Sequence, residues 1–103
     1  MYKLEFLPSA LRDMTDIAYY ISHKLSNPLA AKNLADEMIQ AAEKAADFPY
    51  SYPLYIPVKP LKYEYRKIIV HNYIMFYYVD ENAKSVTIAR VIYGKSNYNH
   101  NLR

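Results

Sequence analysis

The sequence predicts an α+β fold: an N-terminal strand, an antiparallel helical hairpin and a three-stranded antiparallel meander, with the helices packed on one face of a curved sheet. Apolar residues recur at spacings of three and four between residues 10 and 48, which is typical of amphipathic helices. Three apolar segments with strand character follow between residues 64 and 93, separated by short polar segments. A chain of 103 residues has room for one modest core, so we expect a single domain over residues 1–103.

The first predicted element is a short strand over residues 2–7, which Pro8 ends. Ser9 has a side chain suited to the N-cap of the helix that follows. An apolar stripe then runs along one side of this helix: Leu11, Met14, Ala18, Ile21 and Leu25. Such a stripe predicts a helix that packs one face on the core.

A second helix is predicted over residues 29–48 and ends at Pro49. Asn27 is a good N-cap, and Pro28 suits the first helical position. Its apolar stripe consists of Ala31, Leu34, Met38, Ala41, Ala45 and Phe48, widened by Ile39 and Ala42. Because the joint between the two helices is short, they should form an antiparallel hairpin.

The second half of the chain predicts the rest of the sheet. Residues 50–61 contain three prolines, which exclude a helix or a central strand and favour an extended connection. Strands are predicted over residues 64–70, 73–79 and 85–93, with tight turns at 71–72 and 80–84. The strand over 73–79 is apolar on both faces, so it should be central. With helices on one face, the other face or its rim is left for function.

Composition excludes several classes of site. There is no cysteine, so no disulfide or thiolate metal site is expected, which fits a cytoplasmic protein. No apolar run approaches the ~20 residues needed to span a bilayer. The three histidines lack metal-ligand spacing, and the chain has no glycine-rich phosphate loop. We therefore expect no metal and no cofactor.

Charge is distributed unevenly along the chain. The net charge is +3, but residues 1–51 carry −2 and residues 52–103 carry +5. A basic second half should attract an acidic partner, either nucleic acid or an acidic protein segment. The alternative interpretation is an ordinary solvated basic surface.

The C-terminal run contains Gly94, the only glycine of the chain, directly after Tyr93. Glycine allows a positive φ or the close approach of another backbone. The tail after it is polar, and we expect residues 94–103 to lie at the sheet rim and to form part of a contact surface. The candidate contact residues are Arg66, Lys67, Arg90, Tyr93, Lys95, Asn97 and Tyr98.

Metal-free RNA cleavage needs a base, an acid and cations beside the phosphate. Lys67, Arg66, Arg90 and Tyr98 could supply these groups only if they converge. Neighbouring residues of a strand point to opposite faces, which separates Arg66 from Lys67, and the same alternation separates Arg90 from Tyr93.

Arg90 has a structural interpretation as well. Strand alternation places it on the same face as Val86, Ile88 and Ile92. It would then be a partly buried arginine that holds the tail or a turn carbonyl.

These segments resemble the RelE/ParE superfamily of type II toxin–antitoxin toxins over nearly the whole chain. The likeness lies in the helix that opens with Asn27-Pro28 and in the run Val70-His71-Asn72-Tyr73. It also lies in Tyr65-Arg66-Lys67 and in Arg90-Val91-Ile92-Tyr93-Gly94. The ParE-type signature has histidine or tyrosine before this glycine and aspartate three positions after it, where this chain has Tyr93 and Asn97.

The resemblance implies the same α+β fold and a cognate antitoxin, which wraps the toxin with a segment that folds on binding. The ribonuclease branch carries arginines where this chain has Ile74 and Ser96, although Lys67 matches its lysine and Tyr98 lies near its late tyrosine. This difference favours a ParE-like toxin that inhibits DNA gyrase by binding, in a hetero-oligomer with its antitoxin. The alternatives are a ribosome-dependent mRNA endoribonuclease and an inactive relative or interaction module.

Overall fold

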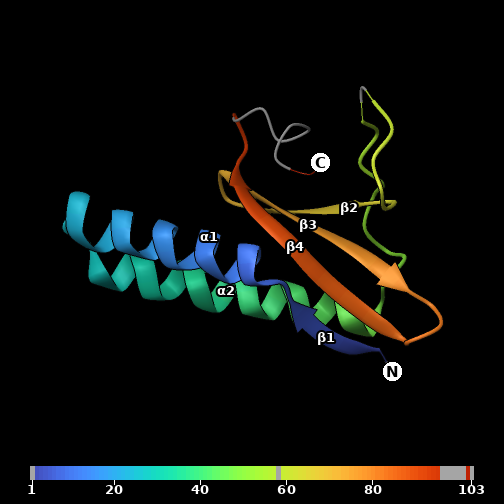
Figure 1. The fold of residues 1–103 in the computed structure, drawn as a ribbon. Helices are drawn as coiled ribbons and strands as arrows, with labels where there is room; N and C mark the ends of the chain where they lie inside the picture. The colour runs from blue at the N-terminus through green and yellow to red at the C-terminus, as the bar shows by residue number, and fades with distance from the viewer. Residues whose placement is uncertain (1, 58, 96–101, 103) are drawn as a thin grey trace.

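A computed structural model describes residues 2–57, 59–95 and 102 of the chain. Two helices lie side by side on one face of a four-stranded sheet with the order β1-β4-β3-β2 (Figure 1). Along the chain the elements are β1 (Lys3–Phe6), α1 (Pro8–Tyr19), the π-helix η1 (Tyr20–Lys24), α2 (Pro28–Asp47), β2 (Arg66–Val70), β3 (Tyr73–Asp80) and β4 (Ser85–Tyr93). The predicted α+β architecture is confirmed.

The sheet contains the predicted meander, since β3 pairs antiparallel with both β2 and β4 and is central. The fourth strand, β1, pairs in parallel with the first half of β4, from Lys3 opposite Ser85 to Phe6 opposite Ile88. Parallel neighbours need a long crossover connection, and here the helical hairpin and the first two strands of the meander lie between β1 and β4 in the chain. The sequence pattern did not predict this pairing.

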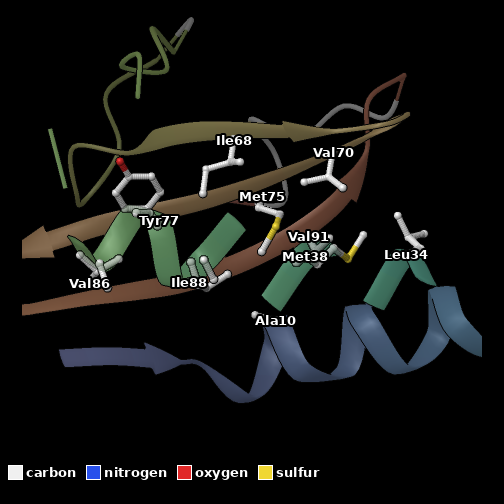
Figure 2. Packing of buried hydrophobic residues seen from close by; sticks show 13 residues of the cluster. Ala10, Leu34, Met38, Ile68, Val70, Met75, Tyr77, Val86, Ile88 and Val91 are labelled. Atoms are coloured by element: carbon white, nitrogen blue, oxygen red, sulfur yellow. The ribbon is translucent and has the colours of Figure 1, made fainter. Parts of the chain in front are cut away.

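The main core lies between the helices and the sheet. Ala10 of α1 and Met38 of α2 face Ile68, Met75 and buried side chains of β4 (Figure 2). Small alanines dominate the buried side of α2, which lets the helix approach the sheet closely. Those alanines are Ala31, Ala42, Ala45 and Ala46.

A second cluster covers the opposite face of the sheet. Phe76 is fully buried there, and Leu102 is only 5% exposed. The connection after α2 supplies most of the cover, and as predicted its described residues form no helix or extended strand, only a bridge between Leu54 and Arg66. Its contributions are Tyr55, Leu61 and Tyr65. The expectation that this face is free for function is therefore wrong for its centre.

The helix ends test the predicted caps. The side chain of Asn27 accepts a hydrogen bond from the Ala30 amide at 3.1 Å, with Pro28 in the first turn, so this cap is confirmed. The Ser9 cap is wrong, because α1 begins at Pro8 after Leu7 and Ser9 lies inside the helix. None of the helices in the described part of the chain is long and apolar enough to cross a membrane.

The first apolar stripe is only partly buried. Met14 and Ile21 of the stripe pack against the core, as does Ile17, which the stripe did not include, whereas Leu25 is 57% exposed. A π-helical turn follows α1 directly, and its extra residue per turn rotates the following side chains off the ideal stripe. Both ends of the first predicted stripe, Leu11 and Leu25, are exposed, and so is Phe48 at the C-terminal end of the second.

Candidate functional site

A groove of about 780 Å³ lies between the C-terminal part of the first helix and the adjacent ends of β3 and β4. One wall comes from α1, η1 and the residue after it, and the other comes from the two strands. The groove is lined by Asp13, Asp16, Ile17, Tyr20, Leu25, Asn72, Tyr73, Arg90, Val91, Ile92 and Tyr93. Its volume lies within the ordinary range of binding sites.

The groove exists because β1 is shorter than β4. The last β1 pair is Phe6 opposite Ile88, and the Leu7 amide then donates to the Ile88 carbonyl at 2.9 Å. Beyond that point α1 replaces the missing strand. The Ser9 hydroxyl donates to the Ala89 carbonyl at 2.8 Å, and the Val91 amide donates to the Asp13 carboxylate at 2.9 Å. Side chains of α1 thus satisfy backbone groups of an otherwise open strand edge.

Asp13 also binds the guanidinium of Arg90. Arg90 donates from Nε at 2.7 Å and from Nη2 at 3.0 Å, a two-point geometry with charge assistance. The two side chains are 14% and 28% exposed. The hydrogen bond to Asp13 raises the pKa of Arg90, although desolvation opposes it. The predicted partial burial of Arg90 is confirmed, and its carboxylate partner is one that the sequence prediction missed.

The prediction that Arg90 shares a face with Val86, Ile88 and Ile92 is wrong for Val86 and Ile88, because the β3–β4 register shifts between Phe76 and Tyr77. Arg90 lies opposite Phe76 while Ile88 lies opposite Tyr77, so Ala89 is an extra residue in β4. The bulge reverses the alternation along the strand. Val86 and Ile88 consequently belong to the helix-side core, whereas Ile92 belongs to the second cluster.

Three tyrosines from different elements meet in the groove. The rings of Tyr73 and Tyr93 are 5.9 Å apart at 67°, an edge-to-face pair, and Tyr20 is 51% exposed in the opposite wall. Burial raises the pKa of Tyr73, and the neighbouring Tyr20 and Tyr93 hydroxyls add to the increase. Within the described part of the chain, no hydrogen bond satisfies the hydroxyl of any of the three.

The β2–β3 turn forms the end of the groove. Its close approach to the backbone just after β4 explains why position 94 is a glycine. The Gly94 amide donates to the Asn72 carbonyl at 2.8 Å, and a Cβ on Gly94 would lie 3.2 Å from that oxygen. The glycine has no positive φ, so it serves close backbone approach. The left-handed residue of this turn is His71 with φ 54°, whose Nε2 lies 2.5 Å from Glu37 of α2.

The structure brings together only part of the predicted site. Arg90 and Tyr93 line the same groove despite the predicted opposite faces, and Lys95 lines an adjoining hollow of about 230 Å³. Asn97 and Tyr98 lie outside the described residues. The groove residues that the prediction missed are Asp13, Asp16, Ile17, Tyr20, Leu25, Asn72, Tyr73, Val91 and Ile92. Ser9 and Asp13, four positions apart, were the available signal, since that spacing puts both polar groups on one helix face.

Arg66 and Lys67 lie elsewhere. Arg66 donates from Nη1 to the Tyr52 carbonyl at 2.7 Å and lies 5.1 Å from the centre of the Tyr50 ring. The Lys67 amide donates to the Pro53 carbonyl at 3.1 Å. Both residues therefore fix the connection after α2 to the edge of β2, away from the groove.

The groove is suited to binding. Its one arginine is paired with Asp13, and it holds no histidine among the described lining residues. Across residues 2–57, 59–95 and 102, no group of three histidine, aspartate or glutamate side chains could hold a metal ion. Apolar walls with a few polar groups at the rim are typical of a surface that takes side chains of a partner.

Two comparisons place this fold among known proteins. A family model described as "ParE toxin of type II toxin-antitoxin system, parDE" matches residues 4–98. No curated protein sequence matches the chain. A structure of the chromosomal ParDE toxin–antitoxin system from P. aeruginosa is similar with a TM-score of 0.62 at 18% identity, covering 90% of this chain and 96% of that one.

A structure of the archaeal RelE–RelB complex from Pyrococcus horikoshii OT3 is also similar. Its TM-score is 0.54 at 12% identity, and the match covers 91% of this chain and 96% of that one. Identities this low show a shared fold, while the family model spans nearly the whole sequence. The chain belongs to the family of ParE toxins of type II toxin–antitoxin systems.

Proposed function

We propose that this ParE toxin inhibits DNA gyrase by binding it, without cleaving RNA, and that a cognate antitoxin neutralises it. The main support is the engagement of the basic residues that a nuclease would need. Arg90 is paired with Asp13, and Arg66 donates to the Tyr52 carbonyl. Stabilising a phosphorane-like transition state requires preorganised cations aimed at the substrate, and these two cations are directed at the protein itself.

The position of Lys67 supports the same conclusion. It lies on β2 opposite Phe76, two strands from Arg90 in the same cross-strand row, and it is not among the described lining residues of the groove. Ile74, which replaces an arginine of the ribonuclease branch, packs partly buried against the second cluster. An apolar side chain at that position contributes packing and no charge.

The proposed partner follows from the relatives. One similar structure comes from a ParDE toxin–antitoxin system and the other from a RelE–RelB complex. We expect the antitoxin to cover the end of the sheet that holds the groove, because exposed apolar side chains gather there. These include Tyr20, Leu25 and Tyr93.

The target is tested with two assays run side by side on the purified chain. Supercoiling by purified gyrase should be inhibited in proportion to toxin concentration, while mRNA on translating ribosomes stays intact. Added antitoxin should restore supercoiling. Codon-register cuts in mRNA with unaffected gyrase would overturn the proposal in favour of the ribonuclease.

A pair of matched variants tests whether the groove end makes the contact. Tyr93 in the groove is 44% exposed, and Tyr63 on the opposite face is 40% exposed. Tyr93→Ala should weaken gyrase inhibition by about tenfold, the effect of losing one aromatic anchor. Tyr63→Ala should inhibit like the parent chain. Equal losses in both variants would mean that the groove is not the contact surface.

A further inference from the structure

The groove has a charge balance unlike that of the second half of the chain. The charged residues among its described lining are Asp13, Asp16 and Arg90. Asp13 and Arg90 neutralise each other, which leaves the exposed carboxylate of Asp16. Within the described residues, Asp16 has no hydrogen-bond or ion-pair partner for its side chain. An acidic segment would therefore meet an unpaired negative charge in the groove.

The walls of the groove are apolar and aromatic. Ile17 and Leu25 come from the helical side, and Val91 comes from β4. Leu25 is more than half exposed in this lining, so its apolar side chain is accessible to a partner. These walls suit an aliphatic or aromatic side chain inserted by a partner.

The π-helix sets the positions of Tyr20 and Leu25 at the mouth of the groove. The Leu25 amide donates to the Tyr20 carbonyl at 3.2 Å, closing the wide turn. Such a turn is rare, and single π turns occur frequently at functional sites. Asp16 lies four residues before Tyr20, so both side chains share one side of the helix.

We propose that the groove binds an apolar segment of the antitoxin that carries a lysine or arginine, and that this cation pairs with Asp16. The inference rests on the proposed function, since it names the chemistry of the antitoxin segment. Charge complementarity carries it: Arg90 is neutralised, so the unpaired acid selects the partner's charge. Occupancy of the groove would also cover Tyr93, which explains how binding blocks the contact with the target.

The test measures the affinity of the purified chain for the purified antitoxin encoded by the neighbouring reading frame. Asp16→Lys should weaken binding by about tenfold or more at low salt, because a like charge then faces the partner's cation. The loss should shrink at high salt, as expected for a screened charge contact. Thermal unfolding should be near that of the parent chain, since Asp16 has no described partner to lose.

The matched control is Asp47→Lys, which makes the same change of charge at the C-terminal end of α2, outside the groove lining. It should leave the affinity within about twofold, because a distant exposed charge is largely screened. Equal effects of the two variants would overturn the inference. Equal losses of affinity would mean that Asp16 does not contact a cation of the antitoxin. The groove would then be empty in the complex or would bind a small molecule instead.

A charge exchange gives the second readout. Each lysine and arginine of the antitoxin is replaced in turn by glutamate, and each variant is titrated against the Asp16→Lys chain. One replacement should restore most of the lost affinity, and an antitoxin series with no rescue would contradict the pairing. Failure of the parent chain to bind the antitoxin would instead reject the proposed function, so the two failures are distinguishable.

Discussion

At the end of the sheet that holds the β3–β4 turn, tyrosine hydroxyls are hydrogen-bonded into the fold, whereas at the opposite end the hydroxyls of the groove tyrosines have no hydrogen bond within the described residues. Tyr2 donates to the Glu81 carboxylate at 2.6 Å, and Tyr50 donates to the same oxygen. Tyr77, fully buried, donates to the Pro49 carbonyl at 2.6 Å. These bonds join the residue before β1, the segment just after α2, strand β3 and the β3–β4 turn.

Glu81 lies at the centre of the end that holds the β3–β4 turn, called the closed end below. The end that holds the groove is called the open end. Hydrogen bonds from Lys84, Tyr2 and Tyr50, in that order of size, lower the pKa of Glu81 to about 2. The bond to Glu81 in turn raises the pKa of Tyr50 to about 12. The comparison teaches that one residue type serves two purposes here. Where a carboxylate or carbonyl lies within reach, tyrosine fastens the fold, and where none does, tyrosine is available to a partner.

The largest expected effect is at the open end, where Asp13 closes the strand edge. Asp13→Ala removes the acceptor of both Arg90 bonds and of the Val91 amide. The free energy of unfolding should fall by about 3 kcal/mol, because a partly buried cation and an amide lose their acceptor. Chemical denaturation measures the change.

Asp16→Ala on the same helix is the stability control and should change the free energy of unfolding by less than about 0.5 kcal/mol. Equal effects of the two substitutions would show that Asp13 does not replace a strand partner. The open end would then owe its structure to packing alone.

The next effect distinguishes the two kinds of tyrosine directly. Tyr77→Phe deletes a buried hydroxyl bonded to Pro49, so the free energy of unfolding should fall by about 1–2 kcal/mol. Tyr73→Phe deletes a groove hydroxyl and should cost almost nothing in stability. Thermal or urea unfolding of both variants checks this difference. A larger loss in Tyr73→Phe would reverse the comparison.

A smaller effect on stability is expected at Gly94, where the backbone after β4 contacts the β2–β3 turn. Gly94→Ala would place a Cβ 3.2 Å from the Asn72 carbonyl oxygen, and the backbone must shift slightly to accept it. We expect a loss of about 1 kcal/mol, typical of mild overpacking. Lys95→Ala, one residue further along and exposed, is the control. An unchanged unfolding midpoint in Gly94→Ala would show that close approach is not the reason for the glycine.

The smallest effect is a pH dependence at the closed end. The carboxyl of Glu81 titrates near 4.5 in the unfolded chain and near 2 in the folded protein, so between these values the unfolded state binds more protons. Its contribution to stability is present above about pH 4.5 and is lost as the pH falls toward 2. Glu81→Gln should flatten the stability curve in this window.

Glu43→Gln, at an exposed position of α2, is the control for the acid titration and should leave the curve unchanged. Parallel curves for the parent chain and Glu81→Gln would mean that the tyrosine bonds to Glu81 do not persist in solution. The closed end would then resemble the open end.

Features that depend on near neighbours in the sequence were predictable. Asn27 and Pro28 start α2, and proline follows its end, because caps and prolines act within a single turn. The last strand was predicted with its observed limits, and β3 was predicted to be central from its apolar character on both faces. The sequence by itself therefore determined the number, order and type of most elements.

Tertiary structure alone decided the features that shape the groove. The parallel pairing of β1 and the bond between Asp13 and Arg90 join residues about eighty positions apart, and the bulge at Ala89 arises in the pairing of β4 with β3. The π-turn at Tyr20 likewise has no local signature in the apolar spacing. A periodic pattern assumes a uniform strand or helix, so one extra residue reverses or rotates every side chain after it. Only the packing of α1 against the open edge of β4 determines which residues meet in the groove.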